Sequence, residues 1–158
     1  MVTAWAQASE IADAVADGSI SAVEVTEAAL ARIAARDGEL NSFTAVLGAR
    51  ALARAEDIDN AHTEGRAVGP LAGVPFAVKN LFDIADLPTL AGSKINRDSA
   101  PARRDAALIE RLEAAGAVLI GALNMGEYAY DFTGENIHDG ASRNPHDLSR
   151  MTGGSSGG

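Results

Sequence analysis

A lysine at the end of a short apolar segment is the first residue of this sequence placed to do chemistry. Phe76-Ala77-Val78 is typical of a buried strand, and Lys79 follows it directly. Ligand crevices in open α/β sheets form at the carboxyl ends of strands. A lysine that is removed from water has a lowered pKa and can act as a base at neutral pH. Position alone favours the plainer interpretation, a surface lysine just past a strand.

The glycine-rich segment Gly153–Gly158, which contains Ser155 and Ser156, is the second candidate. Glycines let the backbone adopt conformations that other residues avoid, and their N–H groups can bind an anion or an oxyanion. The alternatives are a flexible linker and a phosphate-binding loop. A Walker-type loop requires Gly-Lys followed by Ser or Thr, which this segment lacks. The loop by itself leaves the linker and the catalytic interpretations open.

The remaining titratable residues indicate a site less clearly. His62 lies in a polar helical segment, and His138 and His146 are eight residues apart in a segment without a regular pattern. No third ligand accompanies them, so we do not expect a metal site. Glu127 and Asp131 are four residues apart on an expected short helix. They either lie on the helix surface or line a cleft, and the pattern does not distinguish the two.

Several segments, taken together and in this order, resemble the amidase-signature family. They are Gly73–Asn80, Gly92-Ser93, Gly121–Glu127, Asn144-Pro145 and Met151–Gly158. The separation of 76 positions between Lys79 and Ser155 also suits that family. The resemblance extends from residue 7 to the end of the sequence. It implies that Lys79 and the glycine-rich segment belong to one catalytic site.

The resemblance also implies a role for each matching residue. Lys79 matches the general base of the family. Ser155 matches the serine that bridges the lysine and the nucleophile, often through a cis peptide. Met125, Gly126 and Ser156 are expected to bind substrate. The nucleophilic serine of the family lies further along the chain, so it and the backbone oxyanion donors around it are absent from these 158 residues.

The implied reaction is hydrolysis of a linear amide to a carboxylate and ammonia. A serine hydroxyl becomes an effective nucleophile when a base takes its proton, which a neutral lysine can do through a bridging serine. Water then hydrolyses the acyl-enzyme, and no metal or organic cofactor is implied. Asn80 stands where many family members have Asp, a difference that bears on the surroundings of the lysine. Without the nucleophile, we expect these residues alone to hydrolyse no amide.

Within the family, Ser93–Asn96 and Asn124–Asn136 resemble the branch that includes 1-carboxybiuret hydrolase. Related chains are the A subunits of glutamyl-tRNA amidotransferases, which release ammonia from glutamine, and this is the alternative function. Both work within complexes, so the resemblance implies a homo- or hetero-oligomer with a small accessory subunit. The alternative of another class is a non-catalytic binding or scaffold fragment.

The elements expected to position these residues are helices first and then a strand–helix–strand unit. Ser21 and Glu24 form a capping-box pattern that opens the second helix, and Asp37-Gly38 is expected to end it. The segments 84–103 and 133–158 are expected to be mostly irregular. The sequence predicts helices over 4–17, 22–36, 49–63, 106–115 and 126–131, and strands over Phe43–Leu47, Phe76–Val78 and Ala117–Gly121.

This order favours an α/β fold in which a helical N-terminal layer packs on a largely parallel, mixed β-sheet of the amidase-signature kind, incomplete here. We expect residues 1–158 to be the N-terminal part of a single amidase domain, truncated within the signature motif. Its helical region covers roughly 1–65 and its α/β region roughly 66–158. Strands without their partners expose unpaired edges, so we expect the piece to be poorly stable alone.

Composition narrows the classes of function. With 13 basic and 22 acidic residues the net charge is -9, which argues against direct nucleic-acid binding. The absence of cysteine excludes disulfides, thiolate metal sites and a cysteine nucleophile. No apolar segment approaches the length of a membrane helix. We therefore expect a cytoplasmic protein that acts on a small-molecule amide and binds neither nucleic acid nor a membrane.

Overall fold

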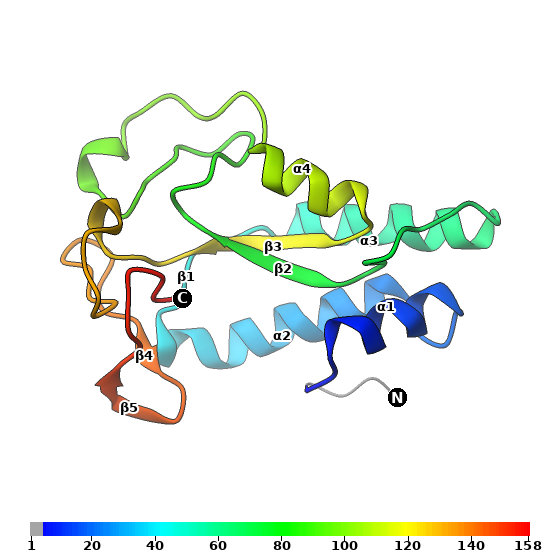
Figure 1. Ribbon diagram of the computed structural model, residues 1–158, viewed down its shortest axis with the longest axis horizontal. Helices are drawn as coiled ribbons and strands as arrows, with labels where there is room; N and C mark the ends of the chain where they lie inside the picture. The colour runs from blue at the N-terminus through cyan, green and yellow to red at the C-terminus, as the bar shows by residue number, and fades with distance from the viewer. Residues whose placement is uncertain (1–4) are drawn as a thin grey trace. The chain divides into compact units, whose positions relative to one another are not determined.

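The computed structural model describes residues 5–158, which form two compact units that interleave along the sequence (Figure 1). The first unit comprises residues 5–33, 47–76 and 108–120, and the second comprises 34–46, 77–107 and 121–158. The helices are α1 (Ala8–Ala16), α2 (Ala22–Leu40), α3 (Gly48–Thr63) and α4 (Ala107–Ala114), with short 3₁₀ turns η1 (Lys94–Asn96) and η2 (Glu127–Ala129). The strands are β1 (Phe43–Val46), β2 (Pro75–Lys79), β3 (Val118–Leu123), β4 (Arg143–Asn144) and β5 (Asp147–Met151).

The main sheet has the order β1-β3-β2. β1 runs antiparallel to β3, with Phe43 opposite Leu123. β2 runs parallel to β3, because the Val118 N–H donates to the Val74 carbonyl at 2.9 Å near one end and the Asn80 N–H donates to the Leu123 carbonyl at 3.0 Å near the other. The sheet is therefore mixed, and α4 connects its parallel pair. This confirms the predicted α/β fold.

The first unit is packed from small side chains. Alanine has no side-chain rotamers to restrict, and its short side chain lets helices approach closely. Ile58 and Ile109 are among the larger residues that fill the remaining space. The buried alanines of this unit are Ala12, Ala22, Ala29, Ala51, Ala55, Ala61, Ala72 and Ala117.

The start of α2 is capped from two places. The Ser21 hydroxyl accepts from the Glu24 N–H at 3.0 Å, and the Glu24 carboxylate accepts from the Ser21 N–H at 2.9 Å, which confirms the predicted capping box. The carboxylate of Asp59, in α3, accepts from the N–H groups of Ala22 at 2.7 Å and Val23 at 3.1 Å. All the backbone donors of the first turn of α2 therefore have acceptors.

The predicted end of α2 at Asp37-Gly38 is wrong, because the helix continues to Leu40. Asn41 adopts the left-handed conformation (φ 55°), which ends a helix and which asparagine tolerates better than most residues. The Asp37 carboxylate accepts from the N–H groups of Ser42 and Phe43, so it orders the residues that follow the helix. Gly38 is accommodated within the helix at a cost of about 1 kcal/mol.

One further prediction for the second unit is wrong. The helix expected over 126–131 is only the turn η2, because Tyr128 (φ 50°) and Ala129 (φ 59°) have positive φ angles that a right-handed helix does not allow. The segment 133–158 is mostly irregular, as predicted, and its only regular structure is the short antiparallel hairpin of β4 and β5. The segment 84–103 has only the turn η1 and is otherwise irregular, as predicted.

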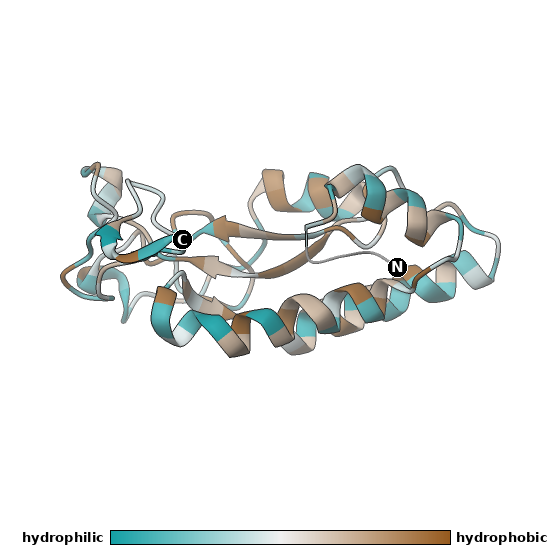
Figure 2. Ribbon diagram, turned by 90° about the horizontal axis from the view of Figure 1, so that it is seen from below, coloured by the Kyte–Doolittle hydropathy of each residue, from teal (hydrophilic) through white to brown (hydrophobic). Residues whose placement is uncertain are grey.

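Hydropathy distinguishes the strands from the helices. In Figure 2, β2 and β3 are hydrophobic along much of their length, whereas the helices alternate between hydrophilic and hydrophobic residues. Even α2, with 19 residues, alternates in this way. Among the helices within residues 5–158, none is both long enough and apolar enough to cross a membrane.

Candidate active site

Lys79 and Ser155 are in direct contact in the second unit. The Lys79 Nζ donates a hydrogen bond to the Ser155 Oγ at 2.6 Å. Lys79 is the last residue of β2, and Ser155 lies in the glycine-rich segment. Both side chains are half-buried. The two residues that were candidates for chemistry in the sequence therefore form one polar pair.

The backbone around Ser155 is fixed by residues 124–126. The Gly126 N–H donates to the Ser155 carbonyl at 2.9 Å, and Met125 and Ser156 form an antiparallel bridge. The Asn124 carbonyl accepts from the N–H groups of Gly157 at 3.2 Å and Gly158 at 3.1 Å. The peptide bond between Gly154 and Ser155 is cis. The glycine-rich segment thus extends the β3 strand edge rather than projecting as a linker.

Burial lowers the pKa of Lys79, because the ammonium form loses hydration. The negative charge of Asp131 acts in the opposite direction and raises that pKa. Conversely, the pKa of Asp131 is lowered chiefly by hydrogen bonds from Thr133, with Lys79 making a smaller contribution. A lysine with a lowered pKa that contacts a serine hydroxyl can exchange a proton with it.

The Asn80 side chain forms hydrogen bonds that hold the end of β2, where Lys79 lies. Its side-chain Nδ2 donates to the Thr44 Oγ1 at 3.2 Å, and its Oδ1 accepts from the Gly92 N–H at 2.9 Å. Thr44 in turn donates to the Ala122 carbonyl at 3.3 Å. Asn80 is buried, so these bonds satisfy groups that water does not reach. The amide donates at a position where an aspartate carboxylate has no proton to give.

Two more buried asparagines hold the loops around the site, and no sequence pattern indicated them. The Asn136 Nδ2 donates to the carbonyls of Gly92 at 2.8 Å and Met125 at 2.7 Å. The Asn124 side chain donates to the carbonyls of Asn41 at 3.2 Å and Gly140 at 3.0 Å. Each asparagine joins segments that are distant in sequence. Local composition does not distinguish such residues from solvated loop asparagines.

Glu127 belongs to a polar cluster rather than to a free helix surface. The buried Ser93 hydroxyl donates to its Oε1 at 2.6 Å, and the His138 Nε2 lies 3.2 Å from the same oxygen. Hydrogen bonds from Ser93 and His138 lower the pKa of the Glu127 carboxyl. Glu127 and Asp131 therefore differ, since Glu127 pairs with His138 and Asp131 acts on Lys79.

The structure brings all five predicted site residues together. Lys79 contacts Ser155, Gly126 binds the backbone of Ser155, and Met125 bridges to Ser156. Met125 and Gly126 are buried, whereas Ser156 is exposed. In the part of the chain that the structure describes, no three His, Cys, Asp or Glu side chains are grouped so as to hold a metal ion.

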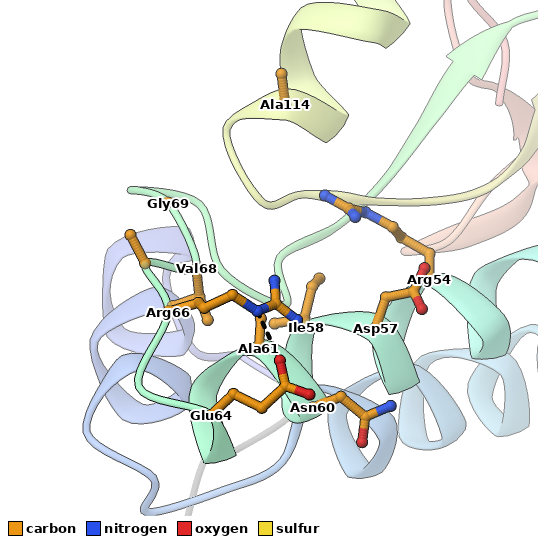
Figure 3. A pocket seen from close by; sticks show the side chains of 11 residues that line it. Arg54, Asp57, Ile58, Asn60, Ala61, Glu64, Arg66, Val68, Gly69 and Ala114 are labelled. Carbon is orange, nitrogen blue, oxygen red and sulfur yellow. Dashed lines mark hydrogen bonds and ion pairs between the residues drawn. The ribbon is translucent and has the colours of Figure 1, made fainter.

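An open hollow of about 650 Å³ lies in the first unit, and its lining residues differ in kind from the Lys79–Ser155 pair. Figure 3 shows Arg66 paired with Glu64, whose atoms are 2.7 Å apart. Arg54 donates to the Glu113 carbonyl at 2.6 Å. The lining contains no lysine, serine, threonine or histidine. This hollow therefore lacks both a lysine and a serine of the kind that are paired in the second unit.

Comparison with known proteins identifies the group to which this site belongs. A family model described as Amidase matches residues 24–158. The chain belongs to the amidase-signature family. This confirms the resemblance inferred from the glycine-rich segment and the lysine segment.

Two kinds of named relative are similar to this chain. The chain is 58% identical over 149 residues to AtzE, the 1-carboxybiuret hydrolase subunit of Pseudomonas sp. strain ADP, covering 94% of this chain and 33% of that protein. It is 46% identical over 151 residues to the A subunit of the glutamyl-tRNA(Gln) amidotransferase of Streptomyces avermitilis, covering 96% of this chain and 30% of that protein. The chain thus spans about a third of the length of these relatives.

Solved structures of the amidase-signature family have the same fold. One, from work on a vestigial protein complex and the evolutionary origins of an s-triazine catabolic enzyme, has a TM-score of 0.92 and 57% identity, over 94% of this chain and 32% of that one. The peptide amidase of Stenotrophomonas maltophilia has a TM-score of 0.89 and 31% identity, over 98% of this chain and 33% of its own. The two units therefore have the backbone that amidase-signature proteins share.

Proposed function

We propose that this chain is part of a C–N hydrolase that cleaves a linear amide to a carboxylate and ammonia. The observation that carries the proposal is the 2.6 Å contact between the Lys79 Nζ and the Ser155 Oγ, made by a lysine whose pKa burial lowers. A base of this kind activates a serine nucleophile at neutral pH. The scaffold interpretation requires no such pair.

The proton path starts from neutral Lys79. The lysine takes the proton of the Ser155 hydroxyl, and Ser155 takes the proton of the nucleophilic serine as that serine attacks the amide carbonyl. The proton then returns through Ser155 to the leaving nitrogen, the C–N bond breaks and ammonia departs. Water then attacks the resulting ester while Ser155 and Lys79 take its proton as before, and the proton returns through Ser155 to the oxygen of the nucleophilic serine as the C–O bond breaks and the acid leaves. Each step uses protein side chains and water alone.

The nucleophile of this scheme lies outside the 158 residues. Because the chain spans about a third of its relatives' length, we place the nucleophilic serine and its oxyanion donors in the remainder of a single amidase domain. These residues alone would then release no ammonia from an amide. The protein produced from the complete gene is the material for every activity measurement below.

The proposed substrate is a small linear amide of the 1-carboxybiuret type. The 58% identity to a 1-carboxybiuret hydrolase subunit supports this choice. An open hollow of about 490 Å³, lined by Tyr130, Asp131 and Phe132 with their neighbours, lies in the same unit as Lys79. We assign Met125, Gly126 and Ser156 to substrate binding, because they hold the backbone next to Ser155.

The role of the A subunit in a glutamyl-tRNA amidotransferase is the second candidate function. The observation that favours it is the 46% identity to such a protein over 96% of the chain. That function uses the same chemistry on the side-chain amide of glutamine. Ammonia release from glutamine, with and without glutamyl-tRNA, separates the two candidates.

A small accessory subunit is the proposed partner, and the cytoplasm is the proposed compartment. The support for the partner is the similarity to a chain described as part of a vestigial protein complex. Homo- or hetero-oligomers are both compatible with it. Purification of the tagged protein from its native cells, followed by mass spectrometry, tests for a stoichiometric small subunit.

Substitution of the two central residues tests the proposed function. Lys79→Ala and Ser155→Ala should each lower kcat for ammonia release by about 10²–10⁴-fold, because each removes a step of proton transfer. The matched control is Lys94→Ala, which removes an exposed lysine of the same unit. Circular dichroism confirms that each variant is folded. Near-normal turnover of either folded variant contradicts the proposal.

A further inference from the structure

Asp131 lies against the two glycines that flank the serine of the candidate site. A Cβ added to Gly126 would lie 1.3 Å from the Asp131 Oδ2, so the carboxylate occupies the space that any side chain at 126 would need. A Cβ added to Gly154 would lie 3.0 Å from the Asp131 Oδ1. Gly126 binds the Ser155 carbonyl, and Gly154 precedes Ser155. The carboxylate thus packs on both sides of Ser155.

The two oxygens of Asp131 have different surroundings. Oδ1 accepts three hydrogen bonds, from the Thr133 N–H at 2.5 Å, the Thr133 hydroxyl at 2.7 Å and the Gly134 N–H at 3.0 Å. Oδ2 is buried and has no hydrogen-bond partner among residues 5–158. Oδ1 alone is enough to hold the local turn, and an asparagine oxygen would do the same. A local turn therefore does not account for the negative charge.

Lys79 is the cation to which this charge is directed. Among the residues that the structure describes, Asp131 is the charged group found to act on Lys79, and the Ser155 hydroxyl is its hydrogen-bond partner. The nearby Glu127 and His138 pair with each other. A buried carboxylate oxygen without a donor, such as the Asp131 Oδ2, is costly unless a positive charge compensates it.

We propose that Asp131 is a positioning residue of the Lys79–Ser155 pair, whose carboxylate holds the serine loop through Gly126 and Gly154 and supplies the negative charge opposite the lysine. The role of Asp131 in catalysis rests on the proposed function, whereas its electrostatic effect on Lys79 does not. When Lys79 takes the serine proton it becomes an ammonium, and Asp131 stabilises that state. The carboxylate also requires residue 126 to be glycine.

Asp131→Asn tests the charge while keeping an oxygen for the turn. The Lys79 ammonium would lose its opposite charge, so the pKa of Lys79 should fall. This is measured by NMR titration of ¹³C-labelled lysine, with the Lys79 signal identified by its loss in Lys79→Arg. The acid limb of the kcat/KM profile should move to lower pH, and kcat should fall more than KM changes. The control Asp98→Asn, at an exposed carboxylate of the same unit, should change neither titration nor profile.

A relocated carboxylate provides the second test, which is decisive if Asp131→Asn does not fold. Asp131→Gly should lower the Lys79 pKa, and Gly126→Asp/Asp131→Gly should restore it, because a side chain at 126 starts at the point that Oδ2 now occupies. Asp131→Asn or Asp131→Gly with an unchanged Lys79 pKa overturns the inference. So does a failure of the double variant to restore it. The titration requires no turnover, so its result is independent of the proposed hydrolase activity.

Discussion

Buried alanines dominate the core of the first unit, whereas buried polar residues organise the second. Asn80, Ser93, Asn124, Asn136 and Ser142 are all buried, and all belong to the second unit. The backbone differs in the same way. Within the described part of the chain, the non-glycine residues with positive φ all lie in the second unit, and they are Asn41, Asp86, Ala91, Tyr128 and Ala129.

The two units differ in their buried residues because one consists mainly of packed helices and the other positions the side chains of the candidate site. A helical layer satisfies its own backbone and needs only a small apolar face, so alanine at helical spacing suffices. The candidate site brings together a lysine and a serine that are 76 positions apart, which requires irregular loops. The carbonyl and N–H groups of such loops are satisfied by side chains instead of by helix or sheet. Asparagine suits this task because it both donates and accepts.

Asn136→Ala should produce the largest loss of stability and is the strongest test of this comparison. It removes two donors to the carbonyls of Gly92 and Met125 and one acceptor of the N–H groups of His138 and Asp139. Buried groups left unsatisfied cost roughly 1–3 kcal/mol each, so the free energy of unfolding should fall by more than about 3 kcal/mol. Urea unfolding followed by circular dichroism measures it.

The matched control for this substitution is Asn60→Ala in the first unit. Asn60 is exposed on α3, and alanine is the better helix former, so stability should stay the same or rise slightly. Equal effects of the two substitutions would show that the loops of the second unit do not depend on their buried asparagine.

How far the sequence predicts the structure depends on the distance between interacting residues. The capping box of Ser21 and Glu24 was predictable because its partners are three residues apart. The cap that Asp59 places on the same helix was not, because Asp59 lies 37 positions beyond Ala22 and helical periodicity does not encode the contact. The turn η2 was predicted to be a helix, since no pattern reveals a positive φ at Tyr128 or Ala129.

The candidate site follows the same rule. Position alone favoured a surface lysine at 79, and only the resemblance linked it to Ser155. Asp131 was noted in the sequence, yet spacing did not show that it acts on Lys79 rather than facing solvent. Its relation to Gly126 depends on a turn that the sequence does not predict.

Ala55→Leu should produce an intermediate effect and tests whether the first unit depends on close packing. Ala55 is fully buried on α3, so the added carbons have no space. Overpacking of this kind costs about 1–3 kcal/mol, measured by urea unfolding. Ala53→Leu, two residues earlier and exposed on the same helix, is the control and should be nearly neutral. If Ala55→Leu left the free energy of unfolding unchanged, the core of the first unit would be loosely packed and would not depend on its buried alanines.

Asp59→Ala should produce the smallest effect and asks whether the first unit also relies on a long-range polar contact. The carboxylate caps the N–H groups of Ala22 and Val23 at the start of α2. Loss of a cap costs about 1 kcal/mol, and the Ser21–Glu24 capping box remains to hold the first turn. Asp57→Ala, at an exposed carboxylate on the same helix, is the control and should change the free energy of unfolding little. If Asp59→Ala lowered the free energy of unfolding as much as Asn136→Ala, the first unit would also depend on a long-range polar contact. The two units would then differ in backbone regularity but not in their dependence on buried hydrogen bonds.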